Sequence, residues 1–369
     1  MAPQWHALAE QIARVLYVSQ RAFNRCDHLF YASELRVTAV GAPVEEDSDE
    51  TIGVIIPFYQ RETGLLNRAL RSAEQAGRHT RRKLTVIITD DESPVSPEAE
   101  VVGINLPITI LRQPNSGPGA ARNYALKHLP AHVRYISFLD SDDEWDELHL
   151  STAEYALEQF DADFFFADFT RPGEGPKLKT TGFRAEDHLF LDARRNLYEY
   201  SGALFLDVLK LLHIGTSTIV YRKSPVPLFA PFETKLRNSH EDTLAWLRIL
   251  KHHHRRAVFT ADITVRYGGG VNIYHNSEWD NPQSLARLRD EILYRKIVSG
   301  EFDIPESERQ FLRMHVRRVR EDAARHILHH VRRGLPGPAR SAIWGYLRND
   351  PAVAGVILGA IWDKVMRDA

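Results

Sequence analysis

The sequence predicts an α/β protein: a mostly parallel sheet flanked by helices, with an N-terminal helical segment and a C-terminal helical extension. Between Thr51 and Thr170, short runs rich in Ile, Val and Phe alternate with amphipathic stretches of helical spacing. The runs are apolar at nearly every position, which is typical of parallel strands covered by helices on both faces. In residues 5–23 and 309–334, by contrast, the apolar residues recur at helical spacing.

Five of the apolar runs are expected to be strands, because each is short, dense in Ile, Val or Phe, and closed by Pro or Asp. Residues 64–77, after the first strand, predict a helix with Gly77 as its C-terminal cap. Residues 118–129, after the third strand, predict a second helix. The expected strands occupy residues 51–57, 83–90, 107–113, 134–140 and 162–168.

The chain has 369 residues, 43% of them hydrophobic, and can hold one large or two ordinary domains. The acidic stretch 44–50 suggests a boundary. We therefore expect three parts: an N-terminal helical accessory segment with its linker, a sheet domain in two halves, and a C-terminal helical region. They span residues 1–50, 51–275 (halves 51–170 and 171–275) and 276–369.

The composition limits the kinds of partner and the cellular compartment that are expected. The net charge of −2 provides no field that would draw the chain to nucleic acid. A single cysteine, Cys26, excludes an intrachain disulfide and fits a reducing compartment. With no signal-peptide pattern and no run of about 18 apolar residues, a cytoplasmic protein is expected. Residues 309–334 place eight arginines around an apolar stripe, which favours a helix that packs its stripe on the rest of the protein. Two alternatives stay open: peripheral contact with the inner face of the plasma membrane, and a homodimer through the C-terminal helices.

An acidic cluster, "DSDDE", follows the fourth expected strand, at the sheet edge where ligands of such folds bind. Two like charges about 4 Å apart repel by about 4 kcal/mol at an effective dielectric of about 20. A hard divalent ion such as Mg²⁺ or Mn²⁺ would relieve this repulsion, since it prefers carboxylate oxygens. The alternative is that residues 142–144 cap a helix starting near Trp145, where acids complement the helix dipole.

Four motifs, in this order and spacing, resemble family 2 glycosyltransferases of the Rossmann-like GT-A fold: "TIGVIIPFYQRETGLLNRALRSAEQAG", "LTVIITDDES", "NSGPGAARNYAL" and "ISFLDSDDEW". The resemblance covers residues 51–170 and resumes at "SHEDTLAWL". It implies an inverting enzyme that uses a nucleotide-sugar donor, most often a UDP-sugar, and a divalent Mn²⁺ or Mg²⁺ ion. The acceptor would be a hydroxyl of a saccharide or glycolipid, in bacterial polysaccharide or glycolipid synthesis.

The resemblance also implies roles for individual residues. Pro57 and Tyr59 would line the nucleotide base pocket, and Asp91 would contact the base. Arg122 would face the nucleotide. In the Asp-x-Asp motif for metal and diphosphate, the acids are Asp140 and Asp142.

The second acidic pair lies in "SHEDTLAWL", and the resemblance makes Asp242 the catalytic base. Its neighbour Glu241 would raise the pKa of Asp242 toward neutrality. Taken locally, the two acids also fit an ordinary first turn of a helix. His275, after three glycines, is a further candidate ligand for the metal or diphosphate. Glu92 replaces the family's usual glycine, which leaves the turn after Asp91 less certain.

Three rival interpretations remain. "GPGAAR" resembles a dinucleotide fingerprint with Asp140 as the ribose acid, but Arg122 occupies the third glycine position. "FLDSDDE" resembles an aspartyl phosphatase signature, but Glu144 occupies the position of its Thr or Val. The third is a scaffold that binds a sugar nucleotide without turning it over. The one argument against it is that the sequence keeps every acid expected of an active enzyme.

Overall fold

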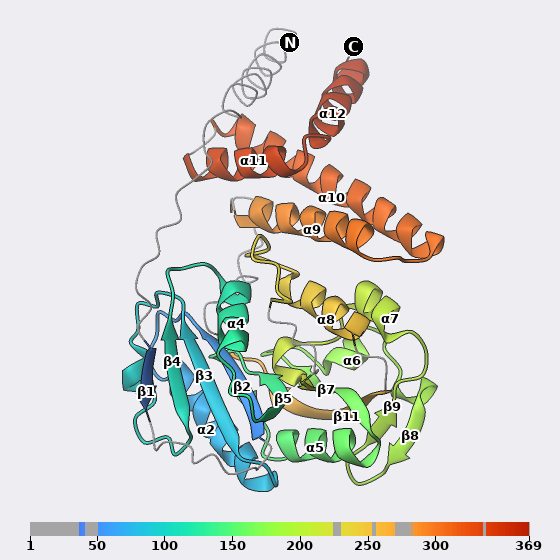
Figure 1. Ribbon diagram of the computed structural model, residues 1–369. Helices are drawn as coiled ribbons and strands as arrows, with labels where there is room; N and C mark the ends of the chain where they lie inside the picture. The colour runs from blue at the N-terminus through green and yellow to red at the C-terminus, as the bar shows by residue number, and fades with distance from the viewer. Residues whose placement is uncertain are drawn as a thin grey trace. The chain divides into compact units, whose positions relative to one another are not determined.

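The computed structural model describes residues 37–40, 51–223, 230–252, 256–269, 281, 283–334 and 337–368 (Figure 1). The described residues divide into two compact units. The sheet unit holds residues 37–40, 51–223, 230–237, 241–252 and 256–269. The helical unit holds residues 238–240, 281, 283–334 and 337–368.

The sheet unit is built on eleven strands, counted over its described residues, in the order β1-β4-β3-β2-β5-β10-β7-β11-β9-β8, with β6 paired to β11. Their bounds are β1 Val37–Val40, β2 Thr51–Phe58, β3 Leu84–Asp90, β4 Ile108–Arg112, β5 Val133–Phe138, β6 Glu144–Trp145, β7 Ala162–Thr170, β8 Leu189–Asp192, β9 Leu197–Glu199, β10 Val220–Arg222 and β11 Arg256–Arg266. The helices are α2 Leu65–His79, α3 Pro97–Glu100, α4 Pro118–Lys127, α5 His149–Gln159, α6 Lys177–Thr180, α7 Leu204–Leu211 and α8 Glu241–His252, with 3-10 turns η2 Ala185–Asp187 and η3 Thr216–Thr218.

The expected α/β class is confirmed, and all five expected strands form, as β2, β3, β4, β5 and β7. The sheet is mixed. Strands β4, β3, β2 and β5 are parallel, as are β7 and β11, whereas β10 runs antiparallel between β5 and β7. β1, β6, β8 and β9 also pair antiparallel. These four strands are only two to four residues long, which is too short to leave a hydrophobic pattern that sequence inspection would detect.

The core of the sheet unit lies between β2, β3 and β7 and the apolar faces of α2 and α5. Every side chain of β2 is buried, because helices cover the strand on both faces. Figure 1 shows α4 on the opposite side of β2 and β3 from α2. This layering leaves the two ends of the strands, rather than the faces of the sheet, as places for polar chemistry.

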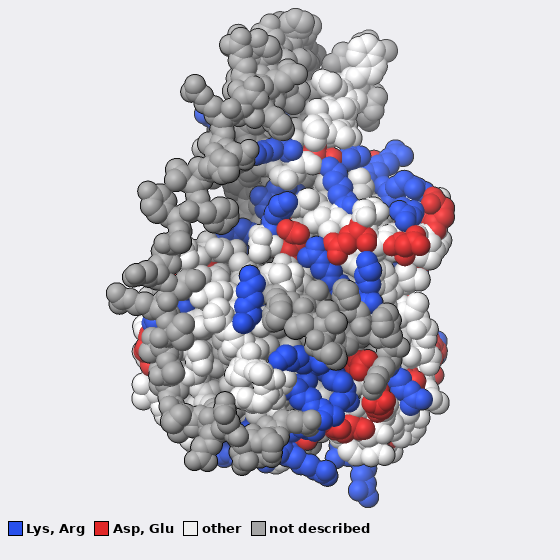
Figure 2. Space-filling model, viewed as in Figure 1, with Lys and Arg blue, Asp and Glu red and all other residues white. Residues whose placement is uncertain are grey.

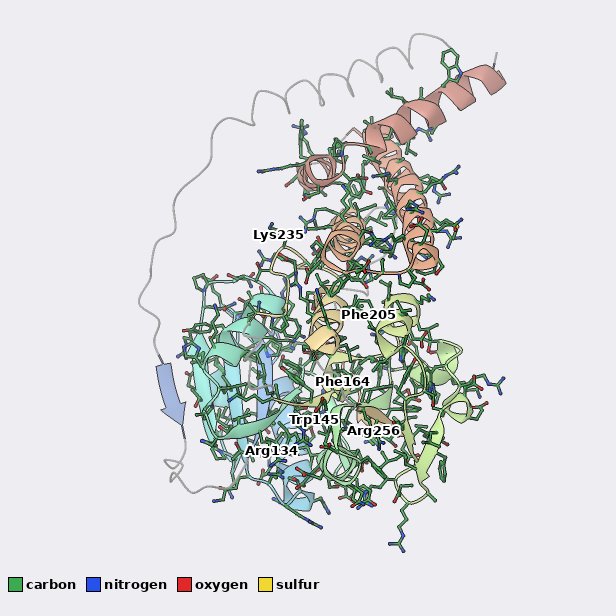
Figure 3. All side chains as sticks on the ribbon, turned by 45° about the vertical axis from the view of Figure 1, so that its right-hand side comes forward. Arg134, Trp145, Phe164, Phe205, Lys235 and Arg256 are labelled. Carbon is green, nitrogen blue, oxygen red and sulfur yellow. The ribbon has the colours of Figure 1, made fainter. Side chains whose placement is uncertain are left out.

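Two local predictions are wrong. Gly77 does not cap α2, which continues to His79; a Cβ atom at Gly77 would lie 2.7 Å from Leu84 Cδ1, so the glycine allows close packing on β3. Residues 142–144 do not cap a helix at Trp145 either. Trp145, labelled in Figure 3, lies in β6, pairs with Val265 and is buried, and α5 begins only at His149.

The helical unit contains α9 Gln283–Glu301, α10 Glu306–Arg332, α11 Gly337–Asn349 and α12 Val353–Asp368. Its core takes buried apolar residues from all four helices, so the expected C-terminal helical extension is confirmed and the stripe of α10 packs against its neighbours. Asp350 is buried at their junction and binds Arg320 and Lys296.

Among the described residues, no helix is both long and apolar enough to cross a bilayer. On the face shown in Figure 2, Lys and Arg side chains gather in a group at the lower centre of the view, with a smaller group of Asp and Glu beside it.

Candidate active site

The loop after β5 is fixed at its centre by Asp143. This buried carboxylate accepts hydrogen bonds from the Ser217 hydroxyl (2.5 Å) and the Gly268 backbone N–H (2.9 Å). Gly268 packs so closely that a Cβ atom there would lie 1.8 Å from the Asp142 carbonyl oxygen. The loop is therefore held against η3 and the segment after β11, while Asp140 and Asp142 remain partly exposed.

Burial raises the pKa of Asp143 well above its ordinary range, and the charges of Asp140 and Asp142 raise it further. Sequence reasoning placed Asp143 only in a possible helix cap, residues 142–144. The density of acids in "DSDDE" was the available signal, but nothing local distinguishes the buried acid from its partly exposed neighbours.

Arg122, on α4, joins the two acidic segments. Its buried guanidinium binds Asp140 Oδ1 through Nη2 at 2.6 Å and Glu241 Oε1 through Nη1 at 3.3 Å. The guanidinium also lies over the Phe232 ring, 5.3 Å from its centroid. The two carboxylates raise the pKa of Arg122 despite its burial, so it stays charged. The structure thus places Arg122 between the acids of the β5 loop and those of α8.

Glu241 and Asp242 form the first turn of α8, as the sequence indicated. Gly119 of α4 lets Glu241 approach closely, since a Cβ atom at Gly119 would lie 3.4 Å from Glu241 Cγ. Asp242 is partly exposed and accepts hydrogen bonds from the Thr216 hydroxyl (3.2 Å) and the Thr243 backbone N–H (2.6 Å). The second pair of acids thus divides into one carboxylate bound by Arg122 and one held by Thr216 and Thr243.

Burial raises the pKa of Glu241 to about 7; the neighbouring Asp242 charge adds to the rise and Arg122 opposes it. A carboxyl group with a pKa near neutrality therefore lies in this turn, and the expectation that Glu241 raises the pKa of Asp242 stays a prediction.

The ends of β2 and β3 bring Pro57, Tyr59 and Asp91 to the same edge, because the Asp91 N–H binds the Phe58 carbonyl at 2.9 Å. The buried Asp91 carboxylate accepts bonds from the Gln113 amide (2.7 Å) and from the backbone N–H groups of residues 116 (2.7 Å) and 117 (2.8 Å). Asp91 therefore orders the loop that leads into α4.

The turn after Asp91 keeps a positive φ without glycine. Glu92 has φ 61°, a conformation that costs a side chain about 1 kcal/mol or more. Its carboxylate accepts a hydrogen bond from the Asn115 N–H at 3.2 Å, which offsets part of this strain. Glu92 thus adopts the positive φ that a glycine would allow at this position.

Gln60 is a residue that sequence reasoning missed. Its side-chain amide donates to the Ser141 hydroxyl at 2.9 Å, and its backbone N–H donates to the Ser93 hydroxyl at 2.9 Å. It thereby joins the ends of β2, β3 and β5. The signal was a polar residue directly after an apolar strand, in "PFYQ".

The described residues include carboxylates that could bind a metal ion, but not a complete set of converging ligands. Within them, no group of three His, Cys, Asp or Glu side chains is placed to hold an ion. His275, the third predicted ligand, lies outside the described residues. The chemistry of Asp140 and Asp142 nevertheless fits a hard cation, because both supply carboxylate oxygens inside an acidic cluster.

The chain is similar to known proteins over most of its length. The model of the family "Glycosyl transferase family 2" matches residues 53–226. The Succinoglycan biosynthesis protein ExoW of Rhizobium meliloti (strain 1021) is 32% identical over 321 residues, covering 82% of this chain and 95% of that protein. An uncharacterized glycosyltransferase of Rickettsia felis is 25% identical over 230 residues, which span 61% of this chain and 34% of that one.

The solved structure of S. aureus TarS 1-349 in complex with UDP-GlcNAc superposes with a TM-score of 0.50 at 17% identity, covering 81% of this chain and 92% of that chain. At this identity the likeness concerns the fold. Fold, motifs and relatives together define an α/β nucleotide-binding type of transferase. The chain belongs to glycosyltransferase family 2 and is a glycosyltransferase of the GT-A fold.

Proposed function

We propose that the chain transfers a sugar, with inversion, from a UDP-sugar to a hydroxyl of a saccharide or glycolipid in the synthesis of a bacterial surface polysaccharide. The observation that carries this proposal is that Arg122 joins the acidic loop after β5 to the acidic first turn of α8 at the carboxyl edge of the sheet. The charges of Asp140, Glu241 and Asp242 act on Arg122, and those of Asp140 and Asp142 act on Asp143. The names of the ExoW and TarS relatives support the polysaccharide and the nucleotide-sugar parts.

Asp140 and Asp142 are the proposed residues for holding Mn²⁺ or Mg²⁺. When bound, the ion would stabilise the charge that develops on the leaving nucleoside diphosphate. Since the described residues provide fewer than three convergent ligands, the remaining oxygens would come from the diphosphate or water. His275 stays a proposal for a further contact.

Asp242 is the proposed general base. Its partly exposed carboxylate accepts bonds from Thr216 through Oδ2 and from Thr243 through Oδ1, which fix its orientation; each oxygen can accept a further bond from an acceptor hydroxyl. Glu241 instead orients Arg122, which also binds Asp140. This chain of contacts ties the base helix to the loop proposed to bind the diphosphate.

Pro57, Tyr59 and Asp91 are proposed to form the wall of the nucleotide base pocket. They share one edge of the sheet with Asp140, and the bonds to Asp91 fix the loop between β4 and α4. Arg122 is proposed to act on the nucleotide site indirectly, through Asp140, because its guanidinium is buried.

The donor site is tested by calorimetric titration with UDP and with GDP, each with Mn²⁺ and with EDTA. We expect UDP binding that needs Mn²⁺ and that Asp142→Asn abolishes, since the substitution removes one charged metal ligand. Glu144→Gln is the matched control: this exposed carboxylate lies two residues further along and pairs with Arg68 at the surface. UDP binding that survives both EDTA and Asp142→Asn contradicts the proposed metal site.

The base is tested by Asp242→Asn. We expect turnover of a UDP-sugar to fall by about 10²–10⁴-fold, the usual contribution of a general base, with UDP affinity retained. Release of UDP from UDP-glucose, UDP-galactose and UDP-N-acetylglucosamine measures the rate. A wild-type chain that binds UDP but turns over none of the donors, with or without saccharide acceptors, is instead a scaffold.

A further inference from the structure

Tyr267, the residue directly after β11, is held beside the acidic loop after β5. Its backbone N–H donates to the Thr170 carbonyl at 2.9 Å, and the backbone N–H of the next residue donates to Asp143 at 2.9 Å. Its ring lies against the Phe169 ring, with centroids 4.4 Å apart, and the Arg171 guanidinium lies over it, 5.2 Å from the centroid. Backbone and ring are therefore both fixed within the sheet unit.

The Tyr267 hydroxyl packs against the segment that supports the proposed base. A Cβ atom at Gly215 would lie 2.2 Å from Tyr267 Oη, so this glycine makes room for the hydroxyl. The residue after Gly215 is Thr216, whose hydroxyl donates to Asp242 at 3.2 Å. The hydroxyl end of Tyr267 thus adjoins the support of Asp242, while its backbone adjoins the loop proposed to hold the metal.

This hydroxyl has no hydrogen-bond partner within the part of the chain that the structure describes, and the side chain is partly exposed. Two other tyrosines of the sheet unit do have such a partner. Tyr155 donates to Asp192 at 3.4 Å, and Tyr200 donates to Asp207 at 2.6 Å. Because the fold fixes the Tyr267 hydroxyl without giving it an acceptor, the hydroxyl is available to a ligand.

The Tyr267 hydroxyl remains a donor at physiological pH. Desolvation by the surrounding chain raises the pKa of Tyr267 well above its ordinary range. The charges of Asp143, Asp140 and Asp242 add to the rise, and Arg171 opposes it. The phenol therefore keeps its proton, which it can donate to an uncharged oxygen of a substrate.

In a displacement with inversion, the reacting carbon of the sugar lies between the leaving phosphate oxygen and the attacking hydroxyl. The metal at Asp140 and Asp142 would bind the phosphate, and Asp242 would face the attacking hydroxyl. We propose that Tyr267 binds the sugar of the donor: its hydroxyl donates a hydrogen bond to an oxygen of that sugar and so helps to select among UDP-sugars. The inference rests on the proposed function, and it assigns a residue to the sugar rather than to the nucleotide.

The test compares Tyr267→Phe with Tyr155→Phe in the full chain. Each substitution removes one hydroxyl and keeps a partly exposed ring that lies under an arginine, since the Arg195 guanidinium is 4.0 Å from the Tyr155 centroid. The Tyr155 hydroxyl, however, already has Asp192 as its acceptor. Calorimetry with Mn²⁺ measures the binding of UDP, UDP-glucose, UDP-galactose and UDP-N-acetylglucosamine to both variants and to the wild type.

For the UDP-sugar that the wild type binds most tightly, we expect Tyr267→Phe to weaken binding by about threefold to tenfold, the usual net effect of one lost hydrogen bond. The kcat/KM for UDP release from this donor should fall by a similar factor. UDP lacks the transferred sugar and should bind equally well to the wild type and to Tyr267→Phe. Tyr155→Phe should change none of these values.

The 2-, 3-, 4- and 6-deoxy forms of the same donor identify the oxygen that accepts the bond. One of them should bind the wild type about threefold to tenfold more weakly than the complete donor, yet bind Tyr267→Phe as tightly as the complete donor does. In this comparison, effects of the missing oxygen that do not involve Tyr267 cancel.

Equal binding of the complete donor to the wild type and to Tyr267→Phe overturns the inference. An equal loss for UDP also overturns it, because the hydroxyl would then serve the nucleotide, and so do deoxy forms that affect both proteins alike. If the wild type binds a UDP-sugar but turns over none, the proposed function fails, and the titrations alone decide whether Tyr267 binds the sugar. If none of the three UDP-sugars binds, both proposals fail.

Discussion

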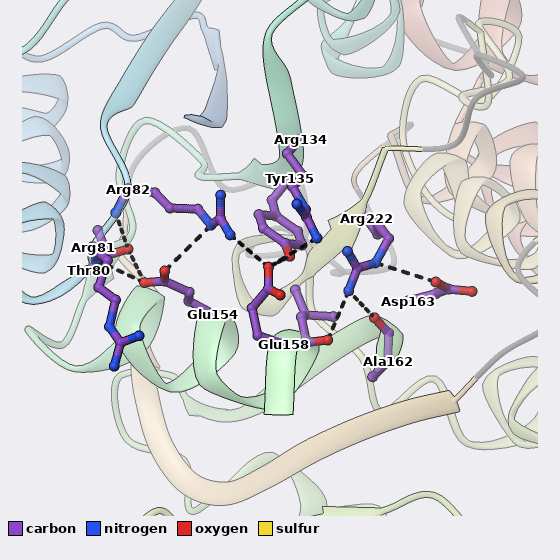
Figure 4. Close-up of polar contacts among 11 residues, drawn as sticks. Thr80, Arg81, Arg82, Arg134, Tyr135, Glu154, Glu158, Ala162, Asp163 and Arg222 are labelled. Carbon is purple, nitrogen blue, oxygen red and sulfur yellow. Dashed lines mark hydrogen bonds and ion pairs between the residues drawn. The ribbon is translucent and has the colours of Figure 1, made fainter. Parts of the chain in front are cut away.

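The two ends of the parallel strands arrange their charges differently. At the amino end, where β3, β5 and β7 begin, three arginines meet three acids around the Tyr135 ring (Figure 4). At the carboxyl end, the buried Arg122 binds Asp140 and Glu241, which come from two acidic segments. The same kinds of side chain thus form an ion-pair network around a tyrosine at one edge and a single arginine shared by two acidic segments at the other.

At the amino edge, each of the three acids pairs with an arginine. Arg82 binds Glu158 at 2.7 Å and Glu154 at 3.5 Å, and Arg134 binds Glu158 at 3.4 Å. The Tyr135 hydroxyl also donates to Glu158, and burial, together with this hydrogen bond, raises the pKa of Tyr135 to about 12. These contacts join α5 to the strands, and every acid has a cation, so this edge needs no ligand.

At the carboxyl edge, one buried arginine is shared by two acidic segments, and acids that lie close together repel one another. A divalent cation, as proposed above, would offset part of this repulsion, and the negative diphosphate of the donor would then bind to the cation. Repulsion that a ligand can offset is therefore a stronger sign of a binding site than charge density, which both edges share.

The difference between the two edges is tested most directly by removing one arginine from each. Arg122→Met leaves Asp140 and Glu241 without their buried partner, and we expect the free energy of unfolding to fall by about 3–5 kcal/mol. Arg134→Met should cost about 1 kcal/mol or less, since its side chain is 32% exposed and Arg82 still pairs with Glu158. Urea unfolding at pH 7.5 measures both. Equal losses would show that the two edges do not differ as described.

The sequence predicted a site at this edge because the signal there is local. Polar residues follow apolar strands in "PFYQ", "TDDES" and "LDSDDEW", and parallel strands bring such ends together. The strands themselves were predictable for the same reason, since burial on both faces leaves an unbroken apolar run in the sequence.

What the sequence could not reveal depends on contacts between distant segments. Asp143 is buried by Ser217, 74 residues away, and Gly268, 125 residues away. Arg122 meets Glu241 across 119 residues, which places its buried guanidinium between Asp140 and Glu241. Asn238 likewise binds Asp290, 52 residues further along the chain. No spacing rule in one sequence encodes such pairs, because they follow from the packing of complete elements.

The smallest expected effect concerns the pH dependence of the carboxyl edge. The pKa of Glu241 rises from its ordinary 4.5 to about 7 on folding, so between these values the folded state binds more protons than the unfolded state. Stability attributable to Glu241 is therefore greatest below about pH 4.5 and is lost as the pH rises toward 7, by up to about 3 kcal/mol.

Glu241→Gln removes this titration and keeps an oxygen that can accept from Arg122. Between pH 5 and pH 8 we expect the free energy of unfolding to decline less in this variant than in the wild type. Glu158→Gln, at the amino edge, is the matched control and should leave that decline unchanged. A decline in Glu241→Gln as steep as that of the wild type would mean that Arg122 keeps Glu241 ionised, and that the acids of this edge are better compensated by the chain itself than their number suggests.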